Sequence, residues 1–77
     1  MVDKLFSQVR DIFVHHLMVE GPVTLSSRLI DDLSLDELEF NELLMTLEEE
    51  FDISIPEEAE ASLVTVGNVV DLVRSLL

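Results

Sequence analysis

Acidic side chains concentrated in the middle of the chain are its most distinctive chemical groups. Thirteen of the seventeen Asp and Glu residues lie between residues 31 and 60, and no Lys or Arg stands between residues 29 and 73. A carboxylate cluster of this kind repels nucleic acid and anionic membranes and attracts basic protein surfaces. A solvated face that only keeps the protein soluble is the plainer interpretation. The one-sided clustering favours a docking surface.

Few side chains are suited to catalysis or metal binding. The chain has no cysteine, which excludes disulfides, thiolate ligands and a cysteine nucleophile. His15 and His16 are neighbours, so on a helix they point about 100° apart and cannot hold one metal ion from the same face. Acid pairs such as Asp31 and Asp32 would bind Ca²⁺ or Mg²⁺ only weakly, as counter-charge. We expect no metal site, no pocket in so small a bundle and no enzymatic activity.

Length and composition predict a single small domain over residues 1–77. The chain is 48% hydrophobic and carries a formal net charge of −13, so we expect it to fold despite its charge. A chain of this length buries only about 60% of its unfolded surface, which allows one modest core. No stretch approaches the roughly 18 apolar residues of a membrane span. We therefore expect a cytoplasmic protein, and a monomer.

Apolar residues at steps of three and four predict a first helix over residues 2–18. Gly21-Pro22 is expected to end it. The segment 23–30 is predicted to be a loop whose four apolar residues pack beneath it. These are Val23, Leu25, Leu29 and Ile30.

The same spacing predicts a second helix that carries seven of the thirteen clustered acids and ends near residue 51. Its N-terminus fits two capping boxes, Ser34 with Glu37 or Asp36 with Glu39, and the sequence does not choose between them. The run Glu48–Glu50 lies where the helix dipole disfavours negative charge, which indicates a use beyond folding. The predicted buried face consists of Leu35, Leu38, Leu43, Leu44, Leu47 and Phe51.

The remaining chain predicts a short helix and a final long one. Pro56 follows an extended link and is well placed to start a brief helix over residues 57–61. Thr65 is predicted to cap the last helix. Its expected buried residues are Val66, Val69, Val70, Val73, Leu76 and Leu77. The predicted fold class is all-α, a small four-helix bundle with three main helices and one short one.

Residues 29–73 resemble the acyl carrier protein family. The resemblance rests on D-L-S-L-D-E-L, L-E-E-E-F-D-I, I-P-E-E and T-V-G-N-V-V, all at the family's spacing. It implies a four-helix bundle in which an acyl chain can lie among the helices. It also implies that the second helix docks on basic patches of acyl-chain-processing enzymes.

The sequence departs from the family at the attachment site. The family attaches 4′-phosphopantetheine to a serine between an aspartate and a leucine, but here Glu37 stands between Asp36 and Leu38. A carboxylate cannot form the stable phosphodiester, and neither Ser34 nor Thr46 occupies the matching position. The family also usually has glycine at residue 34 and an aliphatic residue at 41. We expect no cofactor, unless the family activity is retained.

The leading hypothesis is a carrier-like module of fatty-acid or polyketide biosynthesis that docks to partner enzymes without phosphopantetheine at residue 37. Alternatives are a working acyl carrier whose serine is altered in this chain or that is modified elsewhere, and an acidic regulatory module outside acyl chemistry. Besides Leu38, the expected docking residues are Glu39, Glu42, Met45, Glu48, Glu49 and Ile55.

Overall fold

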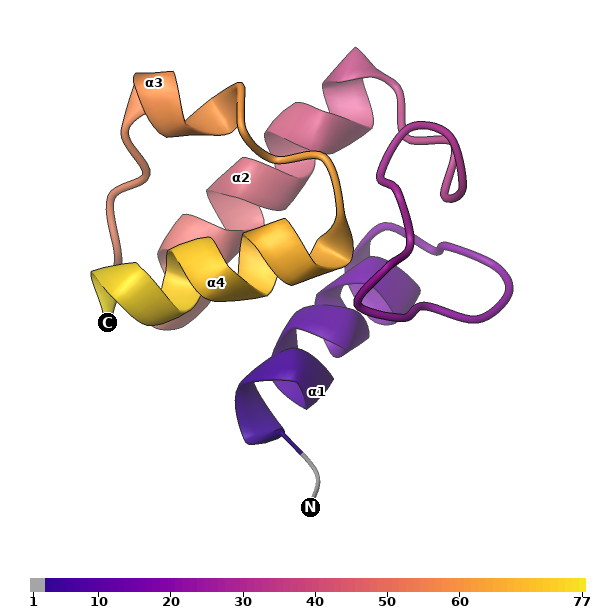
Figure 1. Cartoon of the computed structure of the whole chain (residues 1–77), viewed down its shortest axis with the longest axis horizontal. Helices are drawn as coiled ribbons and strands as arrows, with labels where there is room; N and C mark the ends of the chain where they lie inside the picture. The colour runs from indigo at the N-terminus through magenta and orange to yellow at the C-terminus, as the bar shows by residue number, and fades with distance from the viewer. Residues whose placement is uncertain (1–2) are drawn as a thin grey trace.

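The computed structural model describes residues 3–77 and confirms the all-α fold class. In chain order it has α1 (Lys4–Asp11), the π-helical turn η1 (Ile12–His16), α2 (Glu37–Phe51), α3 (Glu57–Glu60) and α4 (Val66–Leu76). Figure 1 shows α4 crossing α2, with α1 beneath them and the long connection between η1 and α2 looping to one side. The bundle therefore has three main helical segments and one short one.

The first helix is shorter than predicted and changes its winding. Its N-cap is Asp3, whose side chain accepts the backbone N–H groups of Leu5 and Phe6. The predicted start at residue 2 lies outside the described residues. From Ile12 the chain widens into the π turn η1, which ends at His16 rather than at residue 18. Met18 then takes a left-handed conformation, so the helix ends before Gly21-Pro22 is reached.

The connection between η1 and α2 is held against the start of α4 by backbone hydrogen bonds. The N–H of Leu29 donates to the Val64 carbonyl over 2.9 Å, and the N–H of Val66 donates to the Ser27 carbonyl over 2.9 Å. The N–H of Gly67 donates to the Leu25 carbonyl at 2.8 Å. A Cβ at residue 67 would lie 3.0 Å from that carbonyl oxygen, so glycine permits this approach.

The apolar residues of this connection are only partly buried, which corrects the prediction. Val23 and Leu29 lie in the core as expected. Leu25 and Ile30 are exposed: their carbonyl groups accept the N–H groups of Gly67 and Ser34, and the backbone held in this way leaves both side chains at the surface. Ile30 retains 68% of its accessible surface.

The structure shows which of the two possible capping boxes forms at the N-terminus of α2. Asp36 accepts the Glu39 N–H over 2.8 Å, and the Glu39 side chain accepts the Asp36 N–H over 3.3 Å. The frame built on Ser34 and Glu37 is therefore wrong. Ser34 lies outside the helix with φ of 57°, in the left-handed region that favours glycine.

The buried face of α2 matches the prediction with one exception. Leu43, Leu44 and Leu47 are buried, Leu35 is buried just before the helix, and Phe51 is partly buried. Leu38 is 67% exposed and takes no part in the core. Its position one residue after Glu37 places it in the first turn, on the side of α2 that faces away from the other helices.

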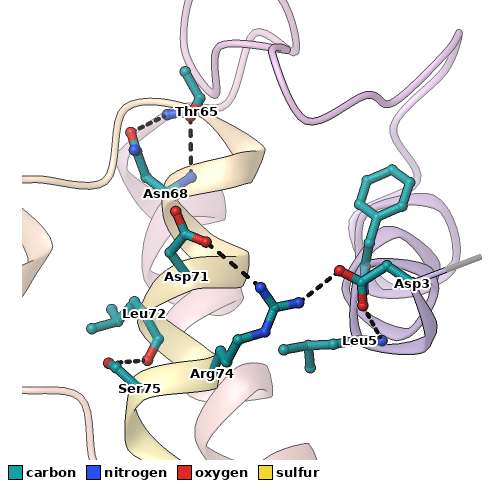
Figure 2. Close-up of polar contacts among 9 residues, drawn as sticks. Asp3, Leu5, Thr65, Asn68, Asp71, Leu72, Arg74 and Ser75 are labelled. Carbon is teal, nitrogen blue, oxygen red and sulfur yellow. Dashed lines mark hydrogen bonds and ion pairs between the residues drawn. The ribbon is translucent and has the colours of Figure 1, made fainter.

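The second half of the bundle agrees closely with its predicted boundaries. Pro56 is the N-cap of α3, and Thr65 caps α4 in a reciprocal capping box with Asn68 (Figure 2). The role of Asn68 in this capping box was not predicted from the sequence. The four valines of α4 that were predicted to be buried are buried, whereas Leu76 is half-buried and Leu77 is exposed at the end of the helix.

The core is formed by aliphatic residues and Phe13 from every segment except α3. α1 packs against α4, and η1 packs against α2. In residues 3–77 the only strand-like pairing is an isolated bridge between Arg28 and Thr65. No helix of the described chain is long and apolar enough to cross a membrane.

Candidate functional site: the outer face of α2 and the groove at its N-terminus

Four of the predicted docking residues form a stripe along the outer face of α2. Leu38, Glu42, Met45 and Glu49 follow one another at steps of four, three and four, which is one face of an α-helix. All four are exposed, and Met45 keeps 61% of its accessible surface. The stripe, as we call these four residues, thus alternates an apolar side chain with a carboxylate.

A hollow borders the stripe. Its volume is about 260 Å³, and Glu42, Met45 and Glu49 line it together with His16 and Leu17 at the end of η1. The structure therefore brings three predicted docking residues to one concave surface and adds an exposed histidine beside them. Sequence reasoning missed His16 because its position depends on how η1 packs against α2.

The other three predicted docking residues form hydrogen bonds within the protein. Glu39 completes the capping box of α2. One carboxylate oxygen of Glu48 accepts the Ile55 N–H over 2.9 Å, which ties the end of α2 to the link before α3. Glu48 and Ile55 are both partly buried. These three residues shape the surface around the stripe more than they present free groups to a partner.

Residue 37, which the resemblance identifies as the attachment position, is the first residue of α2 and is exposed. Its side chain ends in a carboxylate, and the hydroxyl groups nearest to it in the sequence belong to Ser34 and Thr46. Ser34 precedes the helix in its left-handed conformation. The Thr46 hydroxyl donates to the Glu42 carbonyl over 2.8 Å, deep in the helix. Both hydroxyl groups are thus displaced from the start of α2.

A groove runs beside Glu37, contrary to the expectation that so small a bundle has no pocket. Its volume is about 580 Å³. Its walls come from three separate segments: residues 28–31, the N-terminal part of α2, and residues 60–64 from the end of α3 onward. The sequence gives no signal for it, because these segments are distant in the sequence and come together only in the folded chain.

The acids of the described chain are dispersed rather than clustered around a point. In residues 3–77 no group of three His, Asp or Glu side chains is close enough to hold a metal ion. Arg28 forms an exposed ion pair with Asp31 at 3.5 Å, and its N–H donates to Asp32 over 2.7 Å. Exposed pairs of this kind contribute roughly 0–1 kcal/mol.

Comparison with known proteins shows similarity over nearly the whole chain. The sequence profile of a family described as phosphopantetheine attachment site matches residues 7–73. An acyl carrier protein of Borrelia garinii subsp. bavariensis is 42% identical, covering 94% of this chain and 91% of its own length. One from Clostridium acetobutylicum is 39% identical, covering 92% of this chain and 94% of its own length.

Solved structures show the same helical arrangement. A candidate acyl carrier protein from Mycobacterium tuberculosis superposes with a TM-score of 0.87 at 30% identity, over 92% of this chain and 96% of its own. An acyl carrier protein from Thermotoga maritima superposes with a TM-score of 0.81 at 22% identity, over 95% of this chain and 86% of its own. The second likeness concerns the fold alone.

Proposed function

The chain belongs to the acyl carrier protein family, whose members are carriers rather than enzymes, and from that membership we propose that it is a docking module for acyl-chain-processing enzymes. In this proposal it meets basic surfaces of enzymes of fatty-acid or polyketide biosynthesis through α2. It acts as a monomer in the cytoplasm. It carries no phosphopantetheine at residue 37.

The proposal that residue 37 is unmodified rests on chemistry. Phosphopantetheine is held in this family by a phosphodiester to a hydroxyl oxygen, and Glu37 offers a carboxylate in its place. A carboxylate joined to the phosphate would be a mixed anhydride, which water hydrolyses. The hydroxyl groups of Ser34 and Thr46 lie elsewhere, one before the helix and one bonded to its backbone. The residues at the start of α2 therefore do not fit the group.

The observation that carries the docking proposal is the stripe of Leu38, Glu42, Met45 and Glu49. Exposed large apolar side chains supply contact area at an interface, and interspersed carboxylates attract and orient a basic partner. The stripe keeps both kinds of group free, whereas Glu39 and Glu48 are engaged with backbone N–H groups. The proposed docking surface thus includes Glu42 and Glu49 but not every acid of α2.

A purified acyl-carrier-dependent enzyme of fatty-acid synthesis is the appropriate partner for a binding test. We expect its affinity for the chain to fall steeply as ionic strength rises, because screening weakens exposed charge pairs. Glu49→Lys should weaken binding about tenfold or more at low salt. Glu58→Lys, an equally exposed change on α3 outside the stripe, should have a much smaller effect. Affinity that is indifferent to salt, or equal losses in both variants, would refute docking through the stripe.

A further inference from the structure

The groove beside Glu37 combines an apolar floor with a charged rim. Ile30, Phe40, Ala61, Leu63 and Val64 provide the apolar surface. Ile30 and Val64 are 68% and 55% exposed, so their side chains stand open to solvent at the groove. At about 580 Å³ the groove lies within the range of small-molecule sites, roughly 300–1,000 Å³.

The rim of the groove is strongly negative. Four acidic residues, Asp31, Asp36, Glu37 and Glu60, line the groove together with one basic residue, Arg28. Arg28 is engaged with Asp31, and Asp36 accepts the Glu39 N–H at the helix cap. The side-chain carboxylates of Glu37 and Glu60 accept no hydrogen bond from any other residue in the described range 3–77, so they are free to meet a ligand.

Backbone hydrogen bonds fix the groove walls before any ligand arrives. The capping box of Asp36 and Glu39 holds the first turn of α2. The N–H of Leu35 donates to the Leu29 carbonyl over 3.0 Å, closing the turn that carries Ile30. The Asn68 side chain accepts the Val64 N–H over 3.1 Å, which fixes the opposite wall. A ligand would therefore meet a preformed site.

We propose that this groove binds, without a covalent bond, a small amphiphile that joins a single apolar chain to a cationic amino head. The apolar chain lies on Ile30, Phe40 and Val64, and the head lies at Glu37 and Glu60. Charge complementarity selects the head, because an anionic or neutral head would leave the free carboxylates unpaired or repelled. The ligand differs from a tethered acyl chain in having no link to residue 37. This inference does not depend on partner docking.

Titration of the ¹⁵N-labelled chain with decylammonium at neutral pH, below its micelle concentration, tests the proposal. We expect saturable amide shifts at Ile30, Phe40, Leu63 and Val64. Decanoate, with the same chain and an anionic head, should bind about tenfold more weakly or not at all, and butylammonium should not saturate. Equal binding of decanoate would assign the groove to an acyl chain and overturn the proposal. Shifts centred on the stripe, or no saturable binding, would also overturn it.

Charge-neutralising variants separate a built site from general attraction to an acidic protein. Glu37→Gln and Glu60→Gln should each weaken decylammonium binding roughly threefold to tenfold, whereas Glu58→Gln, outside the groove, should leave it unchanged. Ile30→Ser changes an exposed residue, so the fold should survive while the affinity falls. Equal losses in Glu58→Gln would refute the proposal. Concentration-dependent shifts at Ile30 and Val64 without ligand would instead assign the groove to a second copy of the chain.

Discussion

Arg74 in the last turns of α4 joins Asp3 at the N-terminus of α1, with Nη2 and Oδ2 2.6 Å apart (Figure 2). The second amino group of Arg74 lies 3.9 Å from Asp71 on the same helix. The hydrogen bond from Arg74 lowers the pKa of Asp3 below its ordinary value of 3.8. Desolvation opposes this effect, and the N–H of Phe6, the charge of Arg74 and the N–H of Leu5 each lower the pKa further. One guanidinium thus links the first and last helices of a chain that has only four Lys and Arg residues.

Removing the charge of Asp3 should destabilise the protein in a pH-dependent way. A carboxylate whose pKa is lowered by folding stabilises the native state above its unfolded value, and the contribution is lost as pH falls through the folded pKa. Asp3→Asn keeps a good N-cap and removes only the charge. We expect its melting temperature to lie below that of the unchanged chain at neutral pH. The difference should shrink as the pH falls below 3.8 and disappear once the pH lies below the lowered pKa of Asp3.

Thermal unfolding followed by circular dichroism across this pH range measures that difference directly. Asp11→Asn is the matched control, because Asp11 is an exposed acid of α1 that forms no ion pair with the described residues. Acid also relieves repulsion among the other carboxylates, so the two variants must be compared with the unchanged chain at each pH. A deficit of Asp3→Asn that persists in acid would show that the ion pair is not its cause.

Replacing Ser34 with glycine should stabilise the protein. Ser34 has φ of 57°, a conformation that costs an ordinary residue roughly 1–2 kcal/mol, while glycine adopts it at little steric cost. Allowing for the greater chain entropy of glycine, Ser34→Gly should raise the free energy of unfolding by about 0.5–1 kcal/mol. Chemical denaturation gives this value.

The same substitution distinguishes the two capping frames. Loss of the true N-cap destabilises a helix by about 1 kcal/mol, and we expect that loss for Asp36→Ala. If Ser34 were the cap in solution, Ser34→Gly would fail to stabilise the protein and Asp36→Ala would have little effect. That pattern would contradict the capping box between Asp36 and Glu39.

Replacing Glu50 and replacing Glu48, two acids near the end of α2, should have opposite effects on the stability of the protein. Glu50 is exposed near the helix C-terminus, where the dipole disfavours its charge, so Glu50→Gln should stabilise the protein by about 0.3–1 kcal/mol. Glu48→Ala leaves the partly buried Ile55 N–H without its acceptor and should cost roughly 1 kcal/mol. Glu48→Gln retains an acceptor oxygen and is the control. Stabilisation by Glu48→Ala would mean that the bond to Ile55 contributes nothing.

Periodicity predicted the helices well wherever a whole face is buried. The valines of α4 and Leu43, Leu44 and Leu47 of α2 follow the three- and four-residue steps, and the structure buries them. The π turn at Ile12–His16 was not predictable, since a single wider turn leaves the apolar spacing almost unchanged. The exposure of Leu38 was missed because its three-residue step from Leu35 matches the helical period, although Leu35 lies before the start of α2 and Leu38 lies on the outer face.

Contacts between segments that are distant in the sequence could not be predicted from local sequence patterns. The acids of the stripe were identified from sequence because they repeat along one helix. The groove was not, because Ile30, Phe40 and Val64 come from three segments that have no common period. The engagement of Glu48 with Ile55 was missed for the same reason, since the link folds back seven residues onto the helix.

Incubation with coenzyme A and a phosphopantetheinyl transferase, followed by intact-mass measurement, shows whether the chain can carry a phosphopantetheine group. We expect no mass gain for the chain with Glu37. The matched variant Glu37→Ser restores a hydroxyl at the start of an otherwise unchanged helix, and we expect it to gain the mass of one phosphopantetheine group. A gain on the unchanged chain would contradict our account of how this carrier-family protein works.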